Sequence, residues 1–288
     1  MIFILLCIIF CTYLVVCLKL FQKYKVNGFQ GIVFNYIAAF LTGLIIEKKF
    51  PSIENSYSEG WIFYALYLGV SFIFFFNVME LITRKIGPTV TSISGKLSLV
   101  IPVLLGFIFF KEAVTILKIL GILFALVAVI FTASKEKNQP FNFKNLMWPL
   151  LLFFGSGIND SMVKMAQANC LNQNNFDAFN MSIFGIAASM GLLLLIIQLS
   201  LKKQKLEIKN VIGGIALGVP NYFSLIFLIK ALAQPGYEST LVFPFVNIGI
   251  VLLTGICGYF MFNEKFTRLN FFGLVLSIIS LILIAFSI

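Results

Sequence analysis

Long apolar stretches recur along the whole chain, separated by short segments that carry most of the charged residues. Each stretch has about the 20 residues that a helix needs to cross the hydrocarbon core of a bilayer. Their spacing predicts ten membrane-spanning helices, at residues 2–20, 29–47, 60–83, 89–110, 114–133, 146–167, 176–199, 211–232, 237–262 and 267–287. The connectors between them are too short for a soluble catalytic domain, so we expect an all-α integral membrane protein.

Residues of the first half of the chain recur, in the same order, in the second half. The repeated positions pair Lys19 with Lys164, Phe34 and Asn35 with Phe179 and Asn180, Gly69 with Gly218, Gly87 with Gly236, Glu112 with Glu264, and Gly121 with Gly273. Because each copy contains five predicted spans, an odd number, the second copy must cross the membrane in the opposite sense. The sequence therefore predicts two inverted five-helix repeats, residues 1–137 and 141–288.

Composition excludes most other classes of protein. Hydrophobic residues make up 60% of the chain and charged residues 11%, with a mean hydropathy of +1.02, which is far more apolar than a soluble core requires. The net charge of +10 comes from basic residues near the predicted helix ends. There they contact anionic lipid headgroups, so we expect the lipid bilayer, and no nucleic acid, as a partner.

The chain offers no recognisable catalytic or cofactor motif. It contains no histidine, and its five cysteines show no CxxC or other ligand-like spacing, which removes histidine-based catalysis and the usual zinc and haem sites. The segment around Lys96 is like the end of a phosphate-binding loop, but Val90 and Leu97 stand where that motif needs Gly and Ser or Thr. We therefore expect no enzyme activity, no cofactor and no metal.

The third and fourth predicted spans carry ionisable residues that are costly inside a membrane. Lys96 lies about two turns into its span, on a polar stripe with Ser92. Asn77 lies at the same depth if the two spans form a hairpin at Gly87, and Glu80 lies slightly nearer the turn. Either Lys96 and Asn77 face a water-filled cavity, or Lys96 reaches the interface or pairs with Glu80 to hold the fold.

A second polar stripe runs along the sixth span. Ser156, Asn159 and Asp160 follow one another at helical spacing on a helix that is otherwise rich in Leu and Phe. Asp160 is one turn before Lys164, so the two can form a local ion pair that closes the helix. Alternatively, Asp160 takes up and releases a proton as a cavity switches sides.

The eighth and ninth spans add three polar residues at similar depth. Asn221 and Ser224 lie one turn apart, and Asn247 lies at a matching distance on the other side of the turn that connects these spans. Gly214 and Gly218 form a GxxxG face that permits close approach of another helix. This face fits packing within the chain better than a dimer, so we expect a monomer or a weak homodimer.

The repeated segments resemble a known family. Phe109-Phe110-Lys111-Glu112 before Gly121, and Met261-Phe262-Asn263-Glu264 before Gly273, are similar to the tandem signature of the EamA-type ten-span members of the drug/metabolite transporter (DMT) superfamily. The resemblance implies ten helices around a central cavity and transport of small organic solutes, often outward. Members are commonly drawn with both termini in the cytoplasm, whereas the distribution of Lys and Arg here places them outside, so both orientations stay open.

The leading hypothesis is a secondary transporter that moves an amino-acid-like, anionic or zwitterionic metabolite, in the direction of efflux, by alternating access. The proposed substrate-binding residues are Asn77, Lys96, Asn159, Asn221, Ser224 and Asn247. The alternative is a proton-coupled exporter of cationic drugs that uses Asp160 or Glu80. In either case we expect a multi-pass protein of a cell membrane, a bacterial inner membrane, with protons as the candidate coupling ion.

Overall fold

The computed structural model describes residues 2–50, 57–101, 115–133, 143–172, 175–201, 205–232, 239–263 and 267–286. Within these residues the regular structure is entirely helical. The helices are α1 (Ile2–Lys23), α2 (Gly28–Glu47), α4 (Ile62–Lys85), α5 (Pro88–Lys96), the 3-10 helix η1 (Leu97–Leu99), α7 (Ile116–Ala133), α8 (Phe143–Asn169), α9 (Phe176–Ser200), α10 (Ile208–Leu232), α11 (Ser239–Phe262) and α12 (Arg268–Ala285).

The ends of α2 and α5 follow from local sequence. At the start of α2, the Asn27 side chain accepts a hydrogen bond from the backbone N–H of Gln30 at 3.1 Å, which is an N-cap. The helix ends at Lys48, whose left-handed φ of 54° turns the chain. Gly87, with a φ of 148°, precedes α5, and Pro88 begins that helix, where its missing N–H is harmless.

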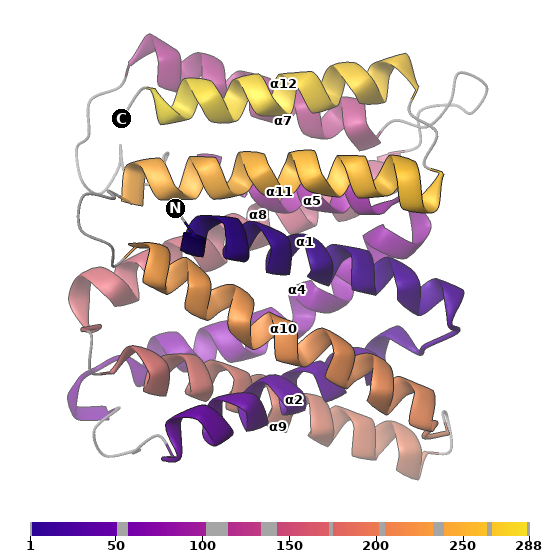
Figure 1. Ribbon diagram of the computed structural model, residues 1–288, viewed down its shortest axis with the longest axis vertical. Coiled ribbons are helices and arrows are strands. Elements are labelled where there is room, and N and C mark those ends of the chain that lie inside the picture. Colours follow the sequence, from indigo (N-terminus) through magenta and orange to yellow (C-terminus); the bar gives the residue numbers. More distant parts are fainter. Residues whose placement is uncertain are drawn as a thin grey trace.

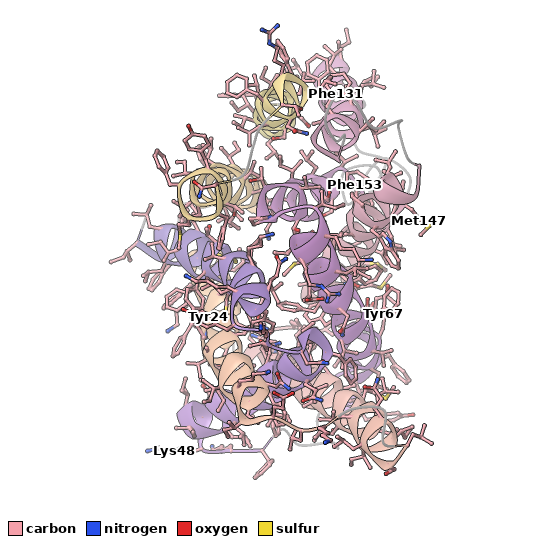
Figure 2. All side chains as sticks on the ribbon, turned by 90° about the vertical axis from the view of Figure 1, so that its right-hand side faces the viewer. Tyr24, Lys48, Tyr67, Phe131, Met147 and Phe153 are labelled. Atoms are coloured by element: carbon pink, nitrogen blue, oxygen red, sulfur yellow. The ribbon has the colours of Figure 1, made fainter. Side chains whose placement is uncertain are left out.

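Six described helices are long and apolar enough to cross a membrane: Ile2–Lys23, Gly28–Glu47, Ile62–Lys85, Phe176–Ser200, Ile208–Leu228 and Phe245–Phe262. Large apolar side chains project outward around the bundle, as the end-on view in Figure 2 shows for Tyr67 and Met147, which are 41% and 46% exposed. A bilayer covers such a surface, whereas water would not tolerate it. The protein is therefore a multi-pass membrane protein. Part of the predicted span at 89–110, together with Glu112 and Glu264, lies outside the described residues.

The long helices lie side by side in a stacked bundle (Figure 1). The α7 and α12 helices form an outer pair at one edge, and α2 and α9 lie toward the opposite edge. α1 begins on the same side of the bundle as α12 ends. The most extensive contacts join α2 to α10 and α7 to α12, so the first and second halves of the chain are interleaved.

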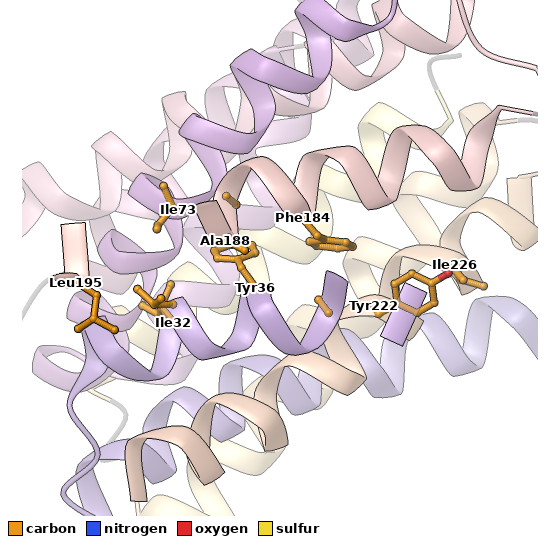
Figure 3. Packing of buried hydrophobic residues seen from close by; sticks show 11 residues of the cluster. Ile32, Tyr36, Ile73, Phe184, Ala188, Leu195, Tyr222 and Ile226 are labelled. Atoms are coloured by element: carbon orange, nitrogen blue, oxygen red, sulfur yellow. The ribbon is translucent and has the colours of Figure 1, made fainter. Parts of the chain in front are cut away.

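The largest apolar cluster lies where α2, α4, α9 and α10 meet (Figure 3). The rings of Tyr36 and Phe184 lie 6.2 Å apart between centroids, and Phe184 lies 6.3 Å from Tyr222. Close approach of α10 to α2 depends on Gly214 and Gly218, because a Cβ on either would collide with the backbone of α2. The GxxxG face thus packs within the chain.

Candidate functional site

A cavity of about 230 Å³ lies between α1, α2, α4, α5, α8, α9 and α10. Its apolar wall is rich in aromatic rings and consists of Val15, Tyr36, Phe72, Phe75, Phe76, Met79, Leu152, Phe184 and Leu225. The remaining wall is polar or small and consists of Thr91, Ser92, Gly95, Lys96, Ser156, Asn159, Asp160, Asn221 and Ser224. A few polar groups that converge on a mostly apolar pocket are typical of a small-molecule site.

Two ionisable side chains, one basic and one acidic, face this cavity from different helices. Lys96 extends from α5 and is half-buried, and Asp160 extends from α8 with a side chain that stays exposed to the cavity. The charge of Lys96 acts on the Asp160 carboxyl group, but among the described side chains neither residue takes part in an ion pair. Both groups are therefore available to a solute.

The backbone is irregular where it carries Lys96. α5 ends at this residue and continues as the 3-10 turn η1. The Ser98 hydroxyl donates to the Gly95 carbonyl at 2.6 Å, and Asn247 on α11 donates to the Lys96 carbonyl in a long hydrogen bond of 3.4 Å. Broken helices at membrane depth need such side-chain donors, because lipid offers none.

Neighbouring helices orient the amide side chains of the wall. Ser71 on α4 donates to the Asn159 Oδ1 atom at 2.5 Å. Asn221 Nδ2 donates to the buried Asn35 Oδ1 at 3.1 Å, and the Ser224 hydroxyl donates to the Asn221 carbonyl at 2.8 Å. Hydrogen bonds of this kind hold binding groups in a defined direction.

Two polar oxygens at the cavity lack a partner among the described residues. They are the buried Tyr36 hydroxyl and the buried Ser92 hydroxyl. A buried hydroxyl without a hydrogen bond is costly, and native proteins rarely leave one unpaired. A polar ligand or water in the cavity would satisfy both oxygens.

The structure brings most of the proposed site residues together. Lys96, Asn159, Asn221, Ser224 and Asp160 all line the cavity. This grouping joins the polar stripes that the sequence placed on three separate spans. The side chain of Lys164, the alternative partner of Asp160, lies outside the described part of the chain.

Three proposed residues lie elsewhere. Asn77 does not line the cavity, and its Nδ2 donates to the Ile73 carbonyl of its own helix at 2.7 Å. Asn247 does not line the cavity, and its side chain contacts the backbone carbonyl of Lys96 instead. Glu80 is buried against Gly28 and pairs with Arg84, whose Nε lies 3.4 Å from the carboxylate. In this structure Glu80 has neither the cavity position nor the contact with Lys96 that the sequence suggested.

Sequence reasoning missed several residues of the cavity. Tyr36 and Thr91 line it, and Ser98 contacts the Asp160 carboxylate at 3.2 Å. The repeat could have found Tyr36, because it follows Asn35 in the repeated Phe-Asn pair. Ser98 follows Lys96 at a helix break that the apolar pattern does not reveal.

No candidate metal or cofactor centre is evident in the part of the chain that the structure describes. No group of three or more His, Cys, Asp or Glu side chains is gathered there. The Cys7 and Cys11 sulfurs lie 3.9 Å apart on one face of α1, next to apolar residues of α10 and α11. The two thiols form part of the helix packing.

Comparison with known proteins gives one informative relative. No family model matches this chain. An uncharacterized protein of Haemophilus influenzae is 31% identical over 271 residues, which cover 91% of this chain and 90% of the relative. Similarity at this level over nearly the full length of both chains shows common descent and a common fold, and the chain therefore belongs to the same family as this Haemophilus influenzae protein.

Proposed function

We propose that the protein is a secondary transporter that moves a small anionic or zwitterionic metabolite, such as an amino-acid-like solute, by alternating access. The observation that carries this proposal is the position of Lys96 and Asp160 on one cavity between membrane helices. Ionisable side chains without an ion-pair partner at membrane depth are costly and usually mark a substrate or ion pathway. Lys96 would bind the anionic group, and the aromatic wall would hold the apolar part.

The proposed architecture is ten spans in two inverted repeats, as in the DMT superfamily. The packing partners support it. If α1, α2, α4, α5 and α7 correspond to α8, α9, α10, α11 and α12, the contact of α2 with α10 has a counterpart in that of α9 with α4, and the contact of α1 with α11 in that of α8 with α5. The pairs α2 with α9, α5 with α11, and α7 with α12 each map onto themselves. A two-fold relation between halves predicts this pattern.

The repeated glycines support the same relation. Gly69 on α4 lies against Ile183 and Ile186 of α9, and its aligned residue Gly218 on α10 lies against Asn35 and Ala38 of α2. The two contacts thus use nearby positions of the aligned helices α9 and α2. Rocking of such paired elements around the cavity would expose it to either side of the membrane.

The test is a flux screen in proteoliposomes against labelled metabolites, with and without a pH gradient. We expect uptake of an anionic or zwitterionic solute that Lys96→Ala reduces by about 10- to 100-fold, since one charged hydrogen bond is lost. The matched control is Lys230→Ala, an exposed lysine near the end of α10, which should transport normally. Flux unchanged by Lys96→Ala would refute the assignment of the site.

A second function is favoured by one observation, the exposed carboxyl of Asp160 in an aromatic-walled cavity. A proton-coupled exporter of organic cations needs such a carboxyl, because the cation and the proton compete for it. In the same screen this function predicts efflux of a cationic dye that requires a pH gradient. Asp160→Asn would abolish that efflux and Lys96→Ala would not.

A further inference from the structure

The Ser98 hydroxyl lies between two oxygen acceptors. Its Oγ atom is 2.6 Å from the Gly95 carbonyl oxygen and 3.2 Å from the Asp160 Oδ2 atom. A hydroxyl carries one proton and so can donate fully to only one of them. A carbonyl oxygen cannot donate, so the shorter contact takes the Ser98 proton.

This assignment of the Ser98 proton determines which protonation state of Asp160 fits the geometry. With its proton directed to Gly95, the Ser98 Oγ presents a lone pair to the Asp160 Oδ2 atom. A carboxylate oxygen would be repelled there, whereas a protonated carboxyl would donate its O–H to Ser98. The arrangement therefore fits a protonated Asp160 and a chain of two hydrogen bonds that ends at the Gly95 carbonyl.

The surroundings make these two hydrogen bonds sensitive to the proton on Asp160. α8 packs against α4, α5, η1 and α7, and Lys96 on α5 is the charged group that acts on Asp160 among the described side chains. The cavity-facing residues of α4 are Phe or Met. Ser98 itself is fully buried, so water does not compete for its hydroxyl.

We propose that Asp160 and Ser98 form a proton-binding site in which Ser98 is a positioning residue. When Asp160 is protonated, its O–H donates to Ser98, and Ser98 donates to the Gly95 carbonyl. When Asp160 gives its proton to water in the cavity, the Ser98 O–H turns to the carboxylate and leaves the Gly95 carbonyl. The turn beside Lys96 then loses a hydrogen bond, which links the proton to the anion-binding residue; this link rests on the proposed transport function.

Infrared difference spectroscopy of the purified full chain in lipid nanodiscs, between two pH values, tests the site without any transport. We expect a carboxylic C=O band that Asp160→Asn removes. Because the protonated carboxyl donates to Ser98, Ser98→Ala should remove this hydrogen bond and shift the frequency of the band.

Two variants make the result specific. Ser98→Thr keeps the hydroxyl and should restore the band, and Ser94→Ala is the matched control, because the buried Ser94 hydroxyl on α5 has no partner among the described residues. A band that is indifferent to Ser98, or absent at every pH, would refute the site. Neither result depends on the flux test of Lys96, so the two proposals can fail separately.

Discussion

Under the proposed repeat, the α2–α10 and α4–α9 helix pairs occupy aligned positions in the two halves of the chain, yet different forces hold them together. Between α2 and α10, Asn210 Nδ2 donates to the Gln30 Oε1 atom at 2.6 Å, and the backbone N–H of Asn27 donates to Asn210 at 2.8 Å. Deeper in the pair, Asn221 bonds to Asn35. Buried neutral amides therefore join α2 to α10 at two depths.

The α4–α9 pair has polar contacts only at its end, among the described residues. There the exposed Glu59 accepts hydrogen bonds from Trp61 Nε1 at 2.7 Å and from Asn175 Nδ2 at 2.8 Å. Beside this cluster the Trp61 and Phe179 rings meet edge to face, 5.9 Å apart, and deeper in the pair the contacts are apolar. Apolar packing without directional bonds lets two helices slide more readily than buried amides do.

A single aligned position explains the difference. Phe72 on α4 stands where α10 has Asn221. Asn35 accepts a hydrogen bond from Asn221, whereas a phenylalanine ring at the aligned position cannot donate one to Asn180, the counterpart of Asn35. Under alternating access we therefore expect α2 and α10 to move as one unit, and α4 to shift against α9.

The largest expected effect separates the two glycine contacts. A Cβ at Gly218 meets the Asn35 backbone, whereas a Cβ at Gly69 meets chiefly the Ile186 side chain. Backbone cannot yield as a side chain can, so Gly218→Ala should lower the free energy of unfolding by about 2–3 kcal/mol and Gly69→Ala by about 1 kcal/mol. The measurement is SDS-induced unfolding in mixed micelles, followed by circular dichroism. Equal losses would show that the two pairs are packed alike.

A smaller effect compares the two aligned asparagines. Asn221→Leu leaves the buried Asn35 amide without its partner and should cost about 1–2 kcal/mol. Asn180→Leu removes an amide whose Nδ2 is already unpaired and should cost less than about 0.5 kcal/mol. The same unfolding assay measures both. A larger loss for Asn180 would mean that α4–α9 depends on a polar contact after all.

The sequence was sufficient to predict an all-helical membrane protein and most of the polar side of the cavity wall. Apolar runs and helical spacing are local properties, so the polar stripe of Ser156, Asn159 and Asp160 could be placed on one face before any packing was known. The spacing of Asn221 and Ser224 predicted a shared helix face for the same reason. The helices of the structure and the composition of this wall agree with that pattern.

Predictions across helices were less successful, because counting residues from a turn gives depth but not rotation about the helix axis. Asn77 was placed at the depth of Lys96, yet its side chain bonds to its own helix. A pair of Glu80 with Lys96 was one of the alternatives, and Glu80 contacts Arg84 and Gly28 instead. Tyr36 gave no polar signal within an apolar span.

A third, small effect concerns Glu59, the charged member of the α4–α9 contact. Its hydrogen bonds to Trp61 and Asn175 are exposed to solvent on one side, and exposed charged contacts contribute little to stability. Glu59→Gln should therefore lower the free energy of unfolding by less than about 1 kcal/mol. It should nevertheless shift the fluorescence of Trp61, read in a Trp148→Phe background because the chain has two tryptophans. A loss as large as that of Gly218→Ala would mean that the polar cluster around Glu59 contributes most of the stability of the α4–α9 contact. The two helix pairs would then differ in where their polar contacts lie, and not in how stable they are.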